Sequence, residues 1–203
     1  MASFNKVKSK IQQIEGGYQN NPNDSGNYNS NNELVGTNYG ITADTYEQVF
    51  GTVPSVEDMQ ALTVGQALDI YKNVYWNGIR GDEIQNQSIA NILFDGFVNM
   101  GYNGVKLMQN TLNVYFNEHL AIDGIVGTMT LGAINARTSP QLHDAYKEAR
   151  LQFYNQIVQN DPSQGVFLEG WTNRLNYFQY SSGSGGGMVL GIAALLLLFM
   201  YSK

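Results

Sequence analysis

Helical spacing of apolar residues recurs along most of this 203-residue chain and limits the folds open to it. In the first such segment Phe4, Val7, Ile11 and Ile14 follow a three–four–three spacing, which places them on one face of a helix. Few stretches alternate with period two, so we expect a mainly α fold. The further segments with helical periodicity are 43–50, 56–59, 63–74, 88–100, 104–116, 127–136 and 139–160.

An asparagine-rich stretch interrupts this pattern directly after the first predicted helix. Gly16 and Gly17 end that helix, and seven Asn follow between positions 20 and 32, together with Pro22 and Gly26. These residue types favour turns, because Asn and Gly tolerate left-handed backbone and Pro fixes its own φ angle. We therefore predict a loop, with a short β-hairpin, over residues 18–38.

Charge and composition exclude several classes of protein. The net charge of −6 without any cluster of Lys or Arg argues against binding to nucleic acid, whose phosphates require such a cluster. The chain has no Cys, so disulfides and Cys-based zinc sites are excluded. Its two His, at positions 119 and 143, are too far apart in sequence to suggest a metal site. We therefore expect neither a metal nor a cofactor.

The C-terminal end of the chain contains its longest apolar run. The segment SSGSGGG (181–187) precedes MVLGIAALLLLFMY (188–201), which has no charged residue. A bilayer span needs about 20 residues, although a shorter one can thin the membrane. We expect a Gly/Ser linker followed by a transmembrane helix that anchors the protein, and the alternative is a buried C-terminal helix. The first 17 residues lack the apolar core of a secretory signal.

Two acidic residues near the asparagine-rich stretch are candidates for general acid–base chemistry. Glu15 follows Ile11 by four residues at the end of the first predicted helix. The negative end of the helix dipole and the neighbouring apolar face both predict a raised pKa for Glu15, as a general acid for glycosidic cleavage requires. Asp24 lies nine residues further on, where a loop can place it across a cleft. Without further motifs, a solvated helix-end Glu and an ordinary turn Asp are the better explanations of the two residues.

Short motifs in a fixed order add to this picture, and together they resemble glycoside hydrolase family 108. These proteins are lysozyme-like N-acetylmuramidases that are common in phages and bacteria and include endolysins. The resemblance covers roughly residues 4–175. The motifs are IEGGYQNNPNDSG (14–26), GTNYGIT (36–42), IYKNVYW (70–76), LFDGFVNMG (93–101), LMQNTLN (107–113), AIDGIVGTMTLGAIN (121–135), RLQFY (150–154) and GWTNR (170–174).

The resemblance implies a lysozyme-like helical fold and roles for particular residues. Glu15 matches the catalytic acid of the family, and Asp24 follows it after eight residues, as in lysozymes. Thr37 matches the Thr that helps to hold the attacking water, but it comes thirteen residues after Asp24, because NYNSNNEL (27–34) is inserted. Its neighbours Asn38 and Tyr39 are the candidate substrate-binding residues, and Tyr39 is the aromatic residue expected to line the cleft.

The second half of the chain resembles the peptidoglycan-binding-3 module that accompanies these catalytic domains. Its mark is DGIVGTMT (123–130), and the alternative is that its helices complete the lysozyme-like core. We predict a catalytic half over 1–88, a peptidoglycan-binding-3-like half over 89–180, a linker over 181–187 and a transmembrane anchor over 188–201. Within these halves we expect Trp76 to be a core residue and Asp95 to be a core carboxylate with hydrogen-bond donors around it.

Three functions are consistent with these features. The first is a muramidase that hydrolyses the β-1,4 bond between N-acetylmuramic acid and N-acetylglucosamine, as a phage lytic or virion-associated enzyme. The second is a lytic transglycosylase that uses Glu15 alone as acid and base. The third is a non-catalytic, membrane-anchored wall-binding virion protein. The expected partners are bacterial peptidoglycan, a lipid membrane and other virion proteins, and the expected location is a phage virion membrane or the host inner membrane.

Overall fold

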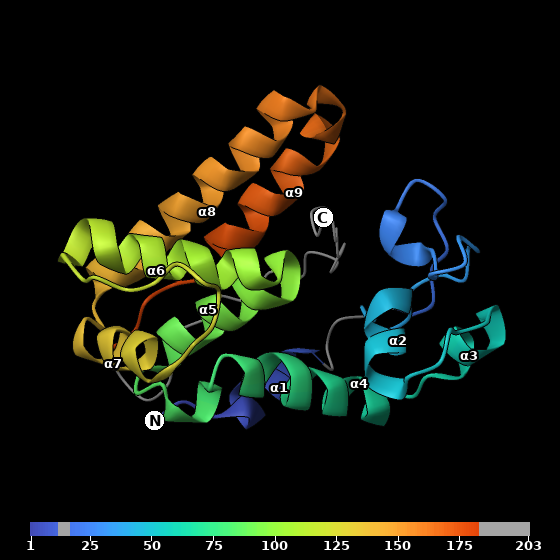
Figure 1. Cartoon of the computed structure of the whole chain (residues 1–203), viewed down its shortest axis with the longest axis horizontal. Coiled ribbons are helices and arrows are strands. Elements are labelled where there is room, and N and C mark those ends of the chain that lie inside the picture. Colours follow the sequence, from blue (N-terminus) through green and yellow to red (C-terminus); the bar gives the residue numbers. More distant parts are fainter. Residues whose placement is uncertain (12–16, 183–203) are drawn as a thin grey trace. The chain divides into compact units, whose positions relative to one another are not determined.

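The computed structural model describes residues 1–11 and 17–182, and in this part of the chain it is mainly helical (Figure 1). Contacts divide these residues into two compact units. Residues 5–74 form the N-terminal unit, and residues 1–4 together with 75–182 form the C-terminal unit. The prediction of a mainly α fold is confirmed for the described residues. The predicted boundary at residue 88 stays a prediction.

Three helices of the N-terminal unit, α2, α3 and α4, begin at side-chain caps. Thr42 accepts a hydrogen bond from the backbone of Thr45, and Ser55 and Thr63 form capping boxes with Asp58 and Gln66. These caps satisfy backbone N–H groups that the first helical turn leaves without partners. The helices are α1 (Phe4–Ile11), α2 (Ala43–Phe50), α3 (Val56–Ala61) and α4 (Val64–Ile70), and α4 continues as the π-helix η2 (Tyr71–Trp76).

One cluster of buried residues in the N-terminal unit joins its loop to two helices. Val35, Ala43 and Met59 are buried together, and Tyr18, Tyr46 and Val56 pack against them. Because Tyr18 and Val35 come from the asparagine-rich loop, this core fastens the loop to α2 and α3. The loop is therefore part of the folded unit and holds its residues in fixed positions.

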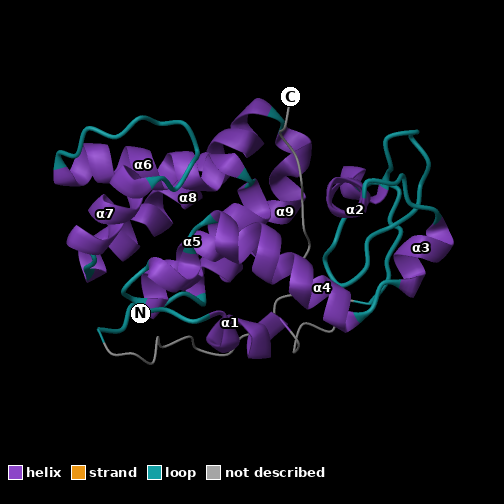
Figure 2. Ribbon diagram, turned by 60° about the horizontal axis from the view of Figure 1, so that its bottom comes forward, coloured by secondary structure: helices purple, strands orange, loops and turns teal. Residues whose placement is uncertain are grey.

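The loop that follows the first helix contains isolated β-bridges in place of the predicted β-hairpin. The bridges join Gln19 with Thr37, Tyr28 with Leu34 and Asn38 with Ile41, all antiparallel. No strand is present among the described residues, as Figure 2 shows. The three-residue 3₁₀ helix η1 (Ser25–Asn27) and side-chain hydrogen bonds take up backbone groups that a hairpin ladder would pair.

Five helices make up most of the C-terminal unit, and α8 and α9 lie side by side (Figure 1). Gly104 allows α5 and α6 to approach closely, because a Cβ atom on it would lie 2.4 Å from the carbonyl oxygen of Gly96. The helices are α5 (Gln87–Met100), α6 (Tyr102–Phe116), α7 (Thr128–Ala136), α8 (Pro140–Asn160) and α9 (Gly165–Asn176), with the 3₁₀ helices η3 (Gly81–Glu83) and η4 (Pro162–Gln164).

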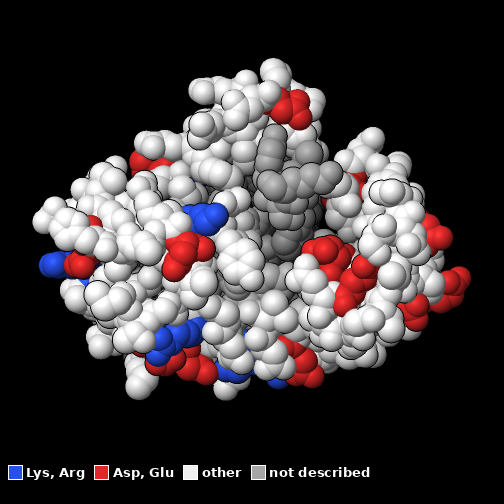
Figure 3. Space-filling view, in the orientation of Figure 1, with Lys and Arg blue, Asp and Glu red and all other residues white. Residues whose placement is uncertain are grey.

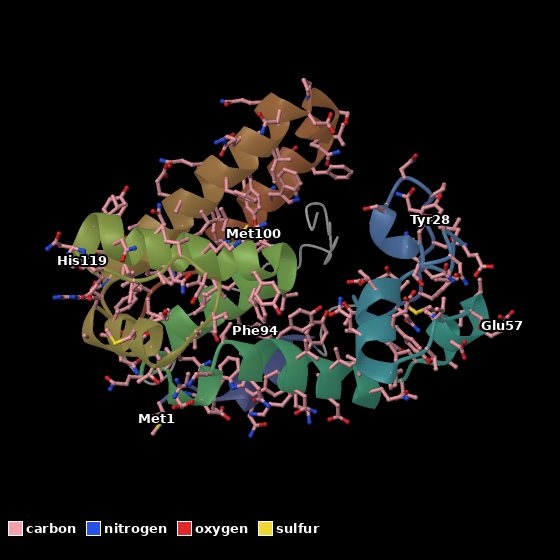
Figure 4. The ribbon with its side chains drawn as sticks, viewed as in Figure 1. Met1, Tyr28, Glu57, Phe94, Met100 and His119 are labelled. Atoms are coloured by element: carbon pink, nitrogen blue, oxygen red, sulfur yellow. The ribbon has the colours of Figure 1, made fainter. Side chains whose placement is uncertain are left out.

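An aromatic cluster forms part of the core of this unit. Trp76 is fully buried between Phe4 and Phe94, with ring centroids 5.9 and 5.8 Å away, and Phe94 is labelled in Figure 4. The indole N–H of Trp76 donates to a carboxylate oxygen of Asp82 over 2.8 Å, so its one polar atom is satisfied. The prediction that Trp76 is a core residue is confirmed.

The predicted fold class needs one further correction. No helix in the part of the chain that the structure describes is long and apolar enough to cross a membrane. The segment 188–201, on which the transmembrane helix was predicted, lies outside the described residues. Its apolar run of fourteen residues falls short of the roughly 20 that a span requires. The transmembrane helix and the membrane anchoring that depended on it are therefore removed from the prediction.

Candidate active site

The asparagine-rich loop brings together most of the residues that the sequence singled out. Asp24, Thr37, Asn38 and Tyr39 all belong to the N-terminal unit. Figure 4 labels Tyr28 in the same loop. Glu15 lies outside the described residues, so its assignment as the catalytic acid stays a prediction.

Asp24 is buried, with 5% of its surface exposed, and caps the 3₁₀ helix η1. Its Oδ1 accepts a hydrogen bond of 2.9 Å from the backbone N–H of Gly26, and its Oδ2 accepts one of 3.3 Å from Nε2 of Gln19. The carboxylate is thus held at both oxygens. A Cβ atom on Gly26 would lie 3.0 Å from Thr42, so the backbone of this turn packs closely against the start of α2.

Thr37 lies beside the same turn although thirteen residues separate it from Asp24 in the sequence. Its side-chain oxygen is 3.5 Å from the carbonyl oxygen of Gly26, and 5% of the residue is exposed. The inserted stretch folds back on itself: Tyr28 pairs with Leu34, and Asn29 and Glu33 bond within it. The insertion therefore leaves Thr37 next to the turn that Asp24 begins.

Asn38 lies in the same loop, but its side chain points to α3. Its Nδ2 donates to the carbonyl oxygens of Met59 at 2.8 Å, Gln60 at 3.4 Å and Leu62 at 3.5 Å. These carbonyls lie at the C-terminal end of α3, where no following backbone N–H of the helix can bond to them. Asn38 is buried, and its amide group ties the loop to α3. Its predicted contact with substrate stays a prediction.

Tyr39 occupies a tight turn beside Thr37 and is partly exposed. Tyr39 and Gly40 both have positive φ angles, and Asn38 and Ile41 exchange two backbone hydrogen bonds across them. This geometry is that of a two-residue type I′ turn. The hydroxyl of Tyr71 donates to the carbonyl oxygen of Tyr39 over 3.2 Å and fixes the turn. The partly exposed ring is consistent with the predicted place in a substrate cleft.

Two amide side chains that the sequence gave no reason to choose connect this site. Gln19 and Asn27 exchange two side-chain hydrogen bonds of 2.9 Å each. Nδ2 of Asn27 also donates to the carbonyl oxygen of Asn21, and the carbonyl oxygen of Asn27 accepts from Val35 and Gly36. Nothing in the spacing of a loop with so many Asn and Gln distinguishes these two from the others.

A second group of charged residues is buried in the C-terminal unit, around Asp95. Oδ2 of Asp95 accepts from Arg150 at 2.7 Å, and Oδ1 accepts from Arg174 at 2.6 Å. Burial alone would raise the pKa of Asp95, but the charges and hydrogen bonds of Arg174 and Arg150 outweigh it and lower the pKa below its ordinary value. The prediction of a core carboxylate is confirmed. Asn99 donates to the backbone carbonyl of Asp95 and not to its side chain.

The described residues include no group of three His, Asp or Glu side chains placed to hold a metal ion. The loop offers the carboxylate of Asp24, the hydroxyl of Thr37 and amide side chains, and Gly26 lies in contact with both Asp24 and Thr37. A carboxylate and a hydroxyl are groups that can orient a water molecule.

Two family models and one solved structure are similar to this chain and indicate its class of protein. A family model described as glycosyl hydrolase 108 matches residues 8–101, and one described as a predicted peptidoglycan domain matches residues 103–176. The structure of SagA from Brucella abortus is similar at a TM-score of 0.69 and 26% sequence identity, over 88% of this chain and 97% of that chain. No curated protein sequence matches the chain.

These matches define a carbohydrate-cleaving enzyme with a domain for its polymer substrate. Residues 8–101 match the glycosyl hydrolase 108 domain, and a predicted peptidoglycan domain follows over residues 103–176. It is a lysozyme-like glycoside hydrolase that degrades peptidoglycan, and peptidoglycan is its partner. The expectation of a non-catalytic wall-binding protein is set aside by this result.

Proposed function

We propose that the enzyme is a muramidase that hydrolyses the β-1,4 bond between N-acetylmuramic acid and N-acetylglucosamine with inversion. In this scheme Glu15 protonates the glycosidic oxygen, and Asp24 takes a proton from a water molecule that Thr37 helps to hold. Inverting enzymes use such a pair, an acid on one side of the sugar and a base with its water on the other. A lytic role in a phage stays a prediction of the family resemblance.

The observation that carries this proposal is the closeness of Thr37 to the turn of Asp24. Thr37 Oγ1 is 3.5 Å from the carbonyl oxygen of Gly26, and Gly26 donates its N–H to Asp24. The inserted stretch 27–34 therefore does not separate the two residues in space. In this scheme the carboxylate of the turn supplies an acceptor, and the hydroxyl beside the turn supplies a donor and acceptor, for the same water.

The first test uses purified full-length protein and purified peptidoglycan. We expect Glu15→Gln to abolish release of new reducing ends, because the amide cannot protonate the leaving oxygen. Asp24→Asn is expected to lower kcat by about 10²–10⁴-fold, the usual contribution of a general base. Asp44→Asn is the control, since Asp44 is an exposed carboxylate on α2 and should leave the rate unchanged. Full activity of Glu15→Gln would overturn the proposal.

A second candidate, a lytic transglycosylase, is favoured by one observation. Both carboxylate oxygens of Asp24 already accept hydrogen bonds from the protein, and the side chain is buried. A transglycosylase needs no second carboxylate, because a hydroxyl of the substrate attacks in place of water. Mass spectrometry of the products separates the two reactions: reducing ends support hydrolysis, and 1,6-anhydro ends support transglycosylation.

A further inference from the structure

We propose that Gln19 is a positioning residue that holds Asp24 and Thr37 in register with one another. This inference rests on the proposed function, because it concerns the two residues that place the attacking water. Gln19 is the residue of the loop whose side chain bonds to Asp24 and whose backbone pairs with Thr37.

The side chain of Gln19 uses both ends of its amide. Nε2 donates to Oδ2 of Asp24 at 3.3 Å and to Oδ1 of Asn27 at 2.9 Å, and an amide nitrogen has two hydrogens to give. Oε1 accepts from Nδ2 of Asn27 and from the backbone N–H of Asn21, both at 2.9 Å. An amide with four hydrogen bonds to three residues has one orientation, so Asp24 meets a fixed donor.

The backbone of Gln19 fixes the second residue. Its N–H donates to the carbonyl of Thr37 over 2.9 Å, and its carbonyl accepts the N–H of Thr37 over 2.8 Å. Two reciprocal bonds between single residues set their relative position without a strand on either side. A displacement of Gln19 would therefore move Asp24 and Thr37 together.

Donation to Oδ2 also has an effect on the rotation of the carboxylate. Oδ1 is held by Gly26 within the same turn, whereas the donor to Oδ2 comes from outside it. With one donor on each oxygen, the plane of the carboxylate is set, and the remaining lone pairs have fixed directions. Such preorganisation matters for catalysis because a misplaced base loses rate without losing substrate affinity.

The test compares two isosteric changes of an amide to an acid in the same loop. Gln19→Glu keeps the acceptor for Asn21 and Asn27 but replaces with an oxygen the nitrogen that donates to Asp24 and to Oδ1 of Asn27. Asn29→Asp is the matched control: its Nδ2 donates to Glu33 at 2.8 Å and to the carbonyl of Pro54 at 3.0 Å, and it does not contact Asp24. We expect both variants to unfold at lower temperature, but only Gln19→Glu to lower kcat, by tenfold or more, with KM little changed.

A double-mutant cycle separates positioning from general stability. Gln19→Met keeps the length of the side chain without its hydrogen bonds, and it is made alone and together with Asp24→Asn. If Gln19 acts through Asp24, the substitution lowers kcat in the wild type and has no further effect on Asp24→Asn. An equal loss in both backgrounds, or a wild-type kcat for both Gln19 variants, would overturn the inference. A wild-type rate for Asp24→Asn alone would instead overturn the proposed role of Asp24.

Discussion

Gly36 is the single residue on which the pairing of Gln19 with Thr37 depends most directly. Its φ angle is +85°, in the left-handed region where residues with a Cβ atom are strained. A Cβ atom there would also lie 2.6 Å from the carbonyl oxygen of Gln19 and 2.6 Å from the ring of Tyr18. This carbonyl oxygen of Gln19 also accepts the N–H of Thr37. A side chain at position 36 would therefore disturb the hydrogen bond between Gln19 and Thr37.

We expect Gly36→Ala to destabilise the protein by about 3 kcal/mol, the sum of left-handed strain and overpacking. It should also lower kcat on peptidoglycan, because the bridge between Gln19 and Thr37 must shift. Gly51→Ala is the control, since its φ is +69° and a Cβ atom there meets nothing within 4 Å. Strain alone should cost it about 1–2 kcal/mol with no change in rate. Thermal unfolding and initial rates measure both, and equal behaviour of the two variants would contradict the argument.

Sequence reasoning at this scale found which residues gather in the loop but not what each side chain contacts. Asp24 was a candidate from its place in the loop and Thr37 from the family resemblance, and in the structure Thr37 lies beside the turn that Asp24 begins. Asn38 was chosen because it adjoins Thr37, yet its amide meets carbonyls of α3, which lie more than twenty residues away in the sequence. Contacts of this range depend on the tertiary fold and leave no local pattern.

Among the helices, α5, α8 and α9 are joined by the ion group of Asp95, Arg150 and Arg174. Arg150 is fully buried, and its guanidinium also donates to the carbonyl of Ile92 and the hydroxyl of Tyr154. One carboxylate here balances two cations, so its loss leaves both without a counter-charge. Burial opposes the charged form of Arg150, but Tyr154 and Asp95 raise its pKa, so it stays protonated.

We expect Asp95→Asn to destabilise the protein by about 3–5 kcal/mol, the usual effect of removing one partner from a buried ion pair. Arg137→Met is the control, because its ion pair with Glu118 has Arg137 47% exposed and should contribute only about 0–1 kcal/mol. Urea unfolding at neutral pH measures both. A loss below about 1 kcal/mol for Asp95→Asn would contradict the role of this group.

The same group predicts how stability depends on pH. The pKa of Asp95 is lower in the folded state, so its stabilisation is fully present above the unfolded value of about 3.9 and is lost as pH falls through the folded value. We therefore expect the difference in unfolding free energy between wild type and Asp95→Asn to be constant from pH 7 to about pH 5 and to shrink below about pH 4. A difference that grows at acid pH would contradict the assignment.

Helix α9 and the π-helix η2 show where periodicity fails as a guide to elements. The segment of α9 contains Gly165 and Gly170, which are poor helix formers, and Leu175 is its one buried residue. Packing on α8, including Trp171 on the ring of Tyr154 at 5.1 Å, supplies the stability that its sequence lacks. In the π-helix Tyr71–Trp76 the hydrogen bonds skip one residue further, and apolar spacing does not reveal that change.

At the scale of the whole chain, the order of motifs predicted the domains and the function better than the apolar tail predicted a membrane anchor. Eight short motifs between residues 14 and 174 indicated the two domains, and family models match both. The tail prediction rested on a Gly/Ser linker and an apolar run, without any motif, and no helix among the described residues supports a membrane span. Short apolar runs are ambiguous because several environments bury them equally well.

Charge is distributed unevenly along the chain, and this bears on how the enzyme meets a cell wall. Residues 17–74 contain seven carboxylates and one lysine, a formal charge of −6 that equals the net charge of the whole chain. In Figure 3 the surface formed by α2, α3 and the preceding loop carries acidic side chains and no basic ones. Anionic polymers attached to peptidoglycan should therefore repel the catalytic domain over the Debye length.

We expect this repulsion to make the hydrolysis of intact walls slow at low ionic strength. Raising the salt from about 10 mM to about 100 mM shortens the Debye length from about 30 to about 10 Å, and the rate on walls that carry anionic polymers should rise roughly twofold or more. Walls stripped of those polymers should show a smaller change. Replacing the exposed Asp44, Glu57 and Asp69 with their amides should remove part of the salt dependence. A rate that falls with salt on both kinds of wall would mean that specific contacts, and not the acidic surface, govern the approach.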